Sequence, residues 1–143
     1  MGVFIFFGGD ENVIKFKLIN LSQIINVFNN IANKQTNIAL SYQILKILKK
    51  LGEEKDIFNN TVRMLRNKYC KVDADGNIVL NANGTFQIKD GLEEEYKKEA
   101  QEFASLEVEL DVDKIRLSQL SNEDIKLSPN ELFTIEDFIE TDI

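Results

Sequence analysis

The feature that most constrains this fold is a long, regular run of apolar residues in the first half of the chain. Eight positions recur at alternating intervals of four and three residues, and seven of them are apolar. They are Ile44, Leu48, Leu51, Lys55, Phe58, Val62, Leu65 and Tyr69. This spacing is typical of a coiled-coil-like helix and not of a strand. We therefore predict one helix from about Ile38 to Tyr69, whose apolar stripe needs a packing partner.

Two short segments with a period of two predict a pair of strands. Ile14, Phe16 and Leu18 alternate with lysines, whereas apolar residues between 106 and 112 alternate with glutamates and an aspartate. Such alternation indicates strands with one buried face. Pairing the two segments would put opposite charges on one face and apolar groups on the other. We expect a small sheet near the termini.

The remaining elements are predicted from helical spacing and from turn residues. Apolar positions predict helices over residues 21–31 and 92–106, and an irregular segment at 115–120. The capping-box sequence Ser128-Pro129-Asn130-Glu131 predicts the start of a last helix, in which Leu132, Ile135, Phe138 and Ile139 face inward. The dipeptides Asp75-Gly76 and Asn83-Gly84 predict tight turns around a β-hairpin. The expected class is α+β: a long antiparallel helical hairpin with a β-hairpin at its tip, within a single domain over residues 13–143.

Residues 1–12 are expected to stand apart from that domain. One interpretation is a flexible or edge-strand extension. The other starts from Gly8-Gly9-Asp10-Glu11-Asn12-Val13, which can be encoded as a ribosome-binding site followed by a GTG start codon. The native protein would then begin at Val13, and the first twelve residues would be a non-native leader.

Composition excludes several classes of function. The 143 residues include no histidine, which excludes Ser-His-Asp and Cys-His catalysis and every His-based zinc site. The single cysteine, Cys70, excludes an internal disulfide and fits a reducing compartment. No apolar run approaches the ~20 residues that span a bilayer. We expect no membrane insertion, no cofactor and no metal.

Charge is divided unevenly along the chain. Residues 1–89 hold 12 basic and seven acidic side chains, whereas residues 90–143 hold five basic and 17 acidic ones. If the long helix folds back on the helix at 92–106, its basic residues near position 66 approach the glutamates of that helix. Each exposed ion pair would contribute ~0–1 kcal/mol to the stability of the fold. The acidic residues predict a partner-binding face, made of Glu93, Glu94, Glu95, Glu99, Glu102, Glu107, Glu109 and Asp111. Such a face can also mimic nucleic acid, although a solvated helix face is the better interpretation of most of these glutamates.

Three further clusters favour structural interpretations. Asp73-Ala74-Asp75-Gly76-Asn77 has neither the glycine nor the glutamate of an EF-hand at the required positions, so a turn is the better interpretation. Cys70 has no histidine partner and is expected to be an unreactive thiol. The basic residues of the long helix are expected to pair with glutamates rather than with nucleic acid, since no aromatic residues alternate with them for base stacking. They are Lys46, Lys49, Lys50, Arg63, Arg66 and Lys68.

The order and spacing of several segments carry a family resemblance. These segments are Ile14-Lys15-Phe16, the end of 38–51 with Lys46-Ile47-Leu48-Lys49-Lys50-Leu51, Val72-Asp73-Ala74-Asp75-Gly76-Asn77, Glu107-Val108-Glu109-Leu110-Asp111, Ile115-Arg116-Leu117-Ser118-Gln119-Leu120 and Leu127-Ser128-Pro129-Asn130-Glu131-Leu132. Over residues 14–140 the chain resembles a family of small phage and prophage proteins defined only as a conserved domain of unknown function. The resemblance implies a viral setting, in the cytoplasm of an infected or lysogenic host cell, and supplies no catalytic residues.

These observations together predict a non-enzymatic phage protein that binds another protein, host or viral. Inhibition of a host nucleic-acid-handling or defence complex, in an anti-CRISPR-like manner, is the leading hypothesis. A virion assembly or tail-accessory protein is the first alternative, and a homodimer would satisfy an unpartnered apolar stripe. The second alternative, an enzyme, would need a metal held by carboxylates. Direct nucleic-acid binding is not expected.

Overall fold

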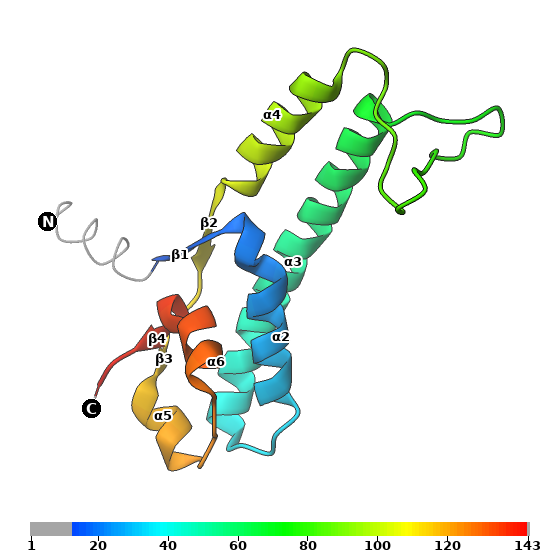
Figure 1. Cartoon of the computed structure of the whole chain (residues 1–143). Coiled ribbons are helices and arrows are strands. Elements are labelled where there is room, and N and C mark those ends of the chain that lie inside the picture. Colours follow the sequence, from blue (N-terminus) through cyan, green and yellow to red (C-terminus); the bar gives the residue numbers. More distant parts are fainter. Residues whose placement is uncertain (1–12, 143) are drawn as a thin grey trace, which may run out of the picture. The chain divides into compact units, whose positions relative to one another are not determined.

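A computed structural model describes residues 13–142, which fall into two compact units. The described part of unit 1 combines residues 13–55 with 107–142, and unit 2 is Asp56–Leu106. Helix α3, Ile38–Tyr69, begins in unit 1 and ends in unit 2 (Figure 1), and its bounds confirm the helix predicted from the apolar spacing. The expectations for residues 1–12 lie outside the described residues.

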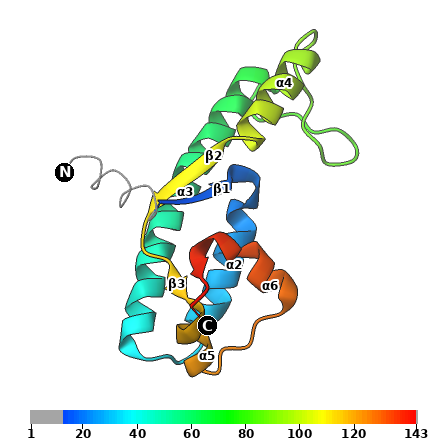
Figure 2. The ribbon, with the colours of Figure 1, turned by 90° about the vertical axis from the view of Figure 1, so that its left-hand side faces the viewer.

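The strand pair of unit 1 forms as predicted from the alternating segments. Strand β1, Val13–Lys17, pairs antiparallel with β2, Glu107–Asp111 (Figure 2). The register sets Ile14 opposite Leu110 and Phe16 opposite Val108, and all four side chains are buried. The lysines of β1 and the carboxylates of β2 project from the other face. Alternation with a period of two therefore separates an apolar inner face from a charged outer face.

Several short elements that follow β1 or β2 in the chain also belong to unit 1. They are the 3-10 helix η1 (Leu18–Asn20), α2 (Leu21–Ala32), β3 (Ile115–Arg116), α5 (Leu117–Asn122), α6 (Pro129–Thr134), the 3-10 helix η2 (Glu136–Phe138) and β4 (Ile139–Glu140). Strands β3 and β4 pair in parallel, and α6 packs against α2 (Figure 2). The described residues thus confirm a mixed helix-and-strand class with a long helix and a two-stranded antiparallel sheet.

Two segments differ from the sequence prediction. Residues 115–120, expected to be irregular, form β3 and the start of α5, in which the Arg116 backbone N–H donates to the Gln119 side chain at 2.9 Å. The last helix does begin with the predicted capping box, because Ser128 Oγ accepts from the Glu131 N–H at 3.1 Å. It ends at Thr134, however, and the chain continues as η2 and β4. Helical spacing within the segment does not predict this end, because it depends on the pairing of β4 with the distant strand β3.

The core of unit 1 joins segments that are far apart in the sequence. The ring of Phe138 lies 5.1 Å from that of Phe28 and 5.7 Å from that of Phe16, measured between centroids. All three side chains are at most 5% exposed. The first half of α3 buries four side chains along one face, Leu40, Ile44, Ile47 and Leu51. The C-terminal segment is therefore anchored in the core by Phe138.

Unit 2 holds the second half of α3 and helix α4, Glu93–Ala104. Phe58 stacks on Phe103 at 5.3 Å, and Tyr69 meets Tyr96 edge-on at 5.6 Å. As the residue number rises along α3 it falls along α4, so these contacts run antiparallel. Tyr69 is buried, whereas the other three rings are half-buried.

The chain between α3 and α4 folds into three short extended segments. Three antiparallel bridges join them, Cys70 with Ile88, Val72 with Ile78, and Leu80 with Phe86. Each segment is thereby bridged to both of the others, and no continuous ladder forms among them. The turns fall where the sequence predicts them, with positive φ at Gly76 (+83°) and Gly84 (+85°). Glycine adopts that conformation without steric cost.

Candidate protein-binding surfaces

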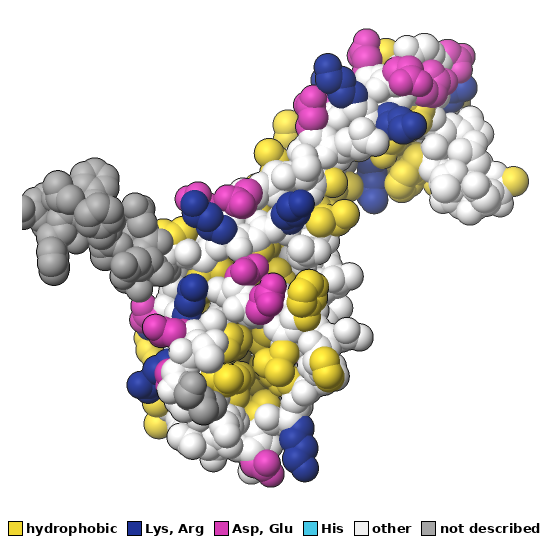
Figure 3. Space-filling model, turned by 60° about the vertical axis from the view of Figure 1, so that its left-hand side comes forward, with side chains coloured by type: hydrophobic (Ala, Val, Ile, Leu, Met, Phe, Trp, Pro, Cys, Tyr) yellow, Lys and Arg dark blue, Asp and Glu magenta, His cyan; other side chains and the backbone are white. Residues whose placement is uncertain are grey.

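Helix α4 presents most of its carboxylates to solvent. Glu93, Glu94 and Glu95 occupy its first turn and are exposed, as is Glu102. Acidic groups in a first turn also stabilise the helix through its dipole, so the sequence position serves local structure as well. Among the described residues, none of these four carboxylates forms an ion pair within 4 Å. Figure 3 shows acidic side chains gathered at the end of unit 2 where the first turn of α4 lies.

Glu99 is the exception on this helix, because it is engaged within unit 2. Its carboxylate accepts from the Tyr69 hydroxyl and from the Lys68 ammonium, the latter at 3.2 Å. The hydrogen bond from Tyr69, and after it the one from Lys68, lowers the pKa of Glu99. The same hydrogen bond to Glu99 raises the pKa of Tyr69. Glu99 therefore links α4 to α3 and contributes less free charge than its neighbours.

The pairing expected for the basic residues of α3 forms only in part. Within the described chain, Lys68 is the member of that group that pairs with a glutamate of α4. Arg66 lies over the ring of Phe86 at 4.7 Å, a cation–π contact, and Arg63 donates to Asn60 at 3.4 Å. The wider ion-pair network predicted for Arg63 and Arg66 with the first turn of α4 is replaced by these local contacts.

The carboxylates of β2 lie beside lysines of β1. Lys15 Nζ is 3.6 Å from Glu109 Oε1, and the register sets Lys17 opposite Glu107. The side chains of Lys15 and Glu109 are 56% and 60% exposed, so this pair is solvated. On the face seen in Figure 3, basic and acidic side chains stand next to one another. The β2 part of the predicted acidic face is therefore a surface of mixed sign.

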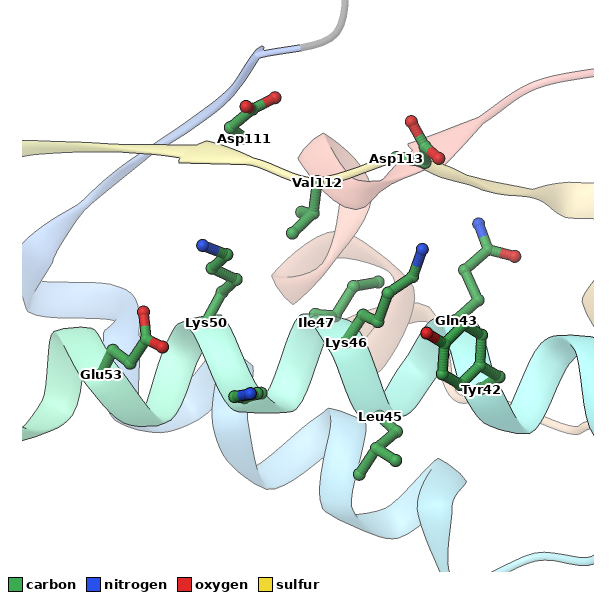
Figure 4. A pocket seen from close by; sticks show the side chains of 11 residues that line it. Tyr42, Gln43, Leu45, Lys46, Ile47, Lys50, Glu53, Asp111, Val112 and Asp113 are labelled. Carbon is green, nitrogen blue, oxygen red and sulfur yellow. The ribbon is translucent and has the colours of Figure 1, made fainter.

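A cavity of about 490 Å³ lies beside β2, between the first half of α3 and the segment after the strand. Figure 4 shows Lys46 and Lys50 pointing from α3 toward Asp111 and Asp113, with Val112 pointing toward Ile47 between them. Among the described residues, no ion pair within 4 Å joins these lysines to these aspartates. The floor is thus apolar and the walls carry opposite charges.

Amide side chains fix one end of this cavity. Gln43 Nε2 donates to the Lys114 carbonyl at 2.9 Å, and Gln119 Nε2 donates to Gln43 Oε1 at 3.1 Å. The Arg116 N–H in turn donates to the Gln119 side chain. This chain of hydrogen bonds holds α5 and the segment after β2 against α3, so the cavity wall is an ordered part of unit 1.

An apolar stripe that was not predicted from the sequence lies on the outer side of α3. Ile38, Tyr42 and Leu45 are 85%, 59% and 61% exposed. Their i, i+4, i+7 spacing is present in the sequence. It was not singled out because the predicted stripe from Ile44 onward is longer and more regular. Lys46, whose ammonium lies 5.1 Å from the centre of the Tyr42 ring, borders this second stripe.

The other candidates take structural positions. The Asp73 carboxylate accepts from the Asp75 and Asn77 backbone N–H groups, each at 2.9 Å, which closes the turn predicted there. Cys70 is a free, buried thiol. Over residues 13–142, no group of three or more Cys, Asp or Glu side chains is placed to hold a metal ion. No helix in that part of the chain is long and apolar enough to cross a membrane.

Comparison with known proteins gives no relative from which function could be transferred. No protein-family model, curated protein or solved structure matches this chain.

Proposed function

We propose that this chain is a non-enzymatic, phage-encoded protein that acts by binding another protein. The exposed carboxylates of α4 would meet a basic groove on the partner. The observation that carries the proposal is the first turn of α4, where Glu93, Glu94 and Glu95 are exposed with no ion pair to another described residue. Steering by such charge raises association rates and makes them sensitive to salt. The phage setting rests on the family resemblance alone.

In this proposal, the second half of α3 and α4 form an antiparallel helical hairpin with a bridged β-hairpin at its tip. The ring contacts Phe58–Phe103 and Tyr69–Tyr96 support this arrangement, as does the Lys68–Glu99 pair. A helix held in this way presents Glu94 and Glu102 on a defined surface. Preorganisation of that kind reduces the entropy lost on binding.

The target class is a host complex that handles nucleic acid or provides defence. Such complexes contain basic grooves, and a carboxylate surface competes for them as the phosphates of DNA do. The anti-CRISPR-like form of this activity needs no catalytic residue on the phage protein. It therefore fits a chain without histidine.

Affinity purification from the natural host, followed by mass spectrometry, tests the proposal. We expect the full chain to recover a nuclease, a polymerase or a defence component, and E94Q/E102Q to recover at least about tenfold less. The control E136Q/D137N removes the same number of charges from exposed positions of unit 1 and should recover as much as the unaltered chain.

Recovery of none of these classes, or equal loss with both variants, would refute the proposal. Stoichiometric presence of the chain in purified virions would instead support the assembly or tail-accessory alternative. A homodimer, which light scattering detects, is compatible with either function.

A further inference from the structure

The outer stripe of α3 is the most distinctive apolar feature of unit 1 that its core does not use. Ile38, Tyr42 and Leu45 follow one another at intervals of four and three residues, so they lie along one line of the helix. At 100° per residue, that line lies on the opposite side of α3 from the buried Ile44 and Leu51. In Figure 4, Leu45 points away from the segment after β2 that the lysines face. Single exposed apolar residues are ordinary, but an aligned set opposite the core is typical of an interaction surface.

Hollows on both sides of Leu45 give this stripe a shape that a partner can fill. One is the cavity of about 490 Å³ that Lys46 and Asp113 help to line. The other, of about 220 Å³, lies toward α2 and is lined by Ala32 and Leu48 among others. Leu45 borders both, so it forms a ridge between two depressions. Side chains of a second helix fit such a ridge by entering the depressions beside it.

The charge beside the stripe determines the chemistry of the partner. From Ile38 to Gly52, α3 contains three lysines and no acidic residue. Within the described residues, Lys46, Lys49 and Lys50 form no ion pair within 4 Å. Lys46 and Lys49 border Tyr42 and Leu45 along the helix. A partner with carboxylates flanking its apolar side chains would pair with these lysines, whereas a basic partner would be repelled.

A second copy of this chain fits the stripe less well. It would bring the same three lysines to the interface. The aspartates of the cavity lie on the segment after β2, from which Leu45 points away (Figure 4), and the nearest acidic residue along α3 is Glu53, beyond the stripe. Like charges brought close together oppose association. The charge balance therefore favours a different protein over self-association.

We infer that the Ile38–Tyr42–Leu45 face of α3 is a docking site for an acidic amphipathic helix of a partner protein. The anchors span seven residues, or ~10 Å of helix, so about two turns of the partner cover them. A contact of that size gives weak and salt-dependent affinity by itself. This face differs from the carboxylate surface of the proposed function, so E94Q/E102Q leaves it intact and the two ideas can fail separately.

Two designed peptides serve as probes for this site. Both are fluorescently labelled helical peptides of about 18 residues with leucines at i, i+4 and i+7. The positions beside the leucines are glutamates in one peptide and lysines in the other. Fluorescence anisotropy with the full chain should show the glutamate peptide binding at least about tenfold more tightly than the lysine peptide. The variant Y42S/L45S should bind the glutamate peptide at least about tenfold more weakly than the unaltered chain does. F133S, which changes another exposed apolar residue of unit 1 (73% exposed), should not.

A charge reversal keeps the inference testable if Y42S/L45S does not fold. K46E/K49E changes only exposed positions and should reverse the preference, so that the lysine peptide binds more tightly. Equal binding of the two peptides, no binding of the glutamate peptide, or equal loss with F133S would overturn the inference. A dimer of the unaltered chain that Y42S/L45S dissociates would also overturn it, because the stripe would then belong to a second copy.

Discussion

Replacing Phe138 by alanine tests whether the C-terminal segment completes the core of unit 1. The side chain is fully buried, and its ring lies against those of Phe28 and Phe16. Truncating a buried phenylalanine costs ~3–5 kcal/mol through lost transfer free energy and the cavity left behind. The cost for Phe138 should fall in the upper part of that range, because its ring contacts two other rings and each aromatic pair adds ~0.5–1.5 kcal/mol beyond area burial. We expect F138A to lower the free energy of unfolding by about 4 kcal/mol.

The matched control lies five residues earlier on the same segment. Phe133 is 73% exposed, so F133A removes the same atoms but should cost at most about 0.5 kcal/mol. F138L keeps much of the volume and should cost about 1–1.5 kcal/mol. Urea unfolding followed by circular dichroism at 222 nm measures all three variants. Hydrogen exchange of peptides from α2 shows whether the loss falls in unit 1.

A cost below about 1 kcal/mol for F138A, or equal costs for F133A and F138A, would refute this prediction. Either result would mean that the three rings do not form a packed cluster. An unchanged exchange rate in α2 peptides of F138A would lead to the same conclusion, since Phe28 belongs to that helix.

Three further perturbations test individual contacts. Lys15→Glu and Glu109→Lys should each destabilise the chain by up to about 1 kcal/mol, and the double swap should restore most of the loss in a double-mutant cycle, because it re-forms the cross-strand pair. Ser128→Ala should cost about 1 kcal/mol in thermal unfolding, since it removes the side-chain acceptor of the capping box. The lowered pKa of Glu99 means that its stabilising effect is complete above the ordinary value near 4.5 and is lost as the pH falls through the folded-state value. Tyr69→Phe removes the main cause of that shift, so an NMR titration should show the pKa of Glu99 rising toward its ordinary value. No change in that titration would contradict the role given to the tyrosine hydroxyl.

Much of the candidate surface could be predicted because exposure follows from local pattern. Glu94 and Glu102 occupy polar positions of an amphipathic helix, and they are exposed as that pattern requires. The charge pairing of β1 with β2 was also predictable, since only one partner offers acidic residues with the same alternation as Lys15 and Lys17. The cavity beside Val112 was not predictable. It depends on how far the segment after β2 lies from α3, and a sequence does not specify that separation.

The sequence by itself determined the elements whose signals are short-range: α3 from its apolar period, the turns at Gly76 and Gly84, and the cap at Ser128. Backbone conformation and local hydrogen bonding specify such features before any distant contact forms. Tertiary structure alone decided that the ring of Phe138 lies against those of Phe16 and Phe28 and that β4 pairs with β3. It also decided that Ile38, Tyr42 and Leu45 face outward. Helical spacing places residues on a common face, but only the packed neighbours decide which face is buried.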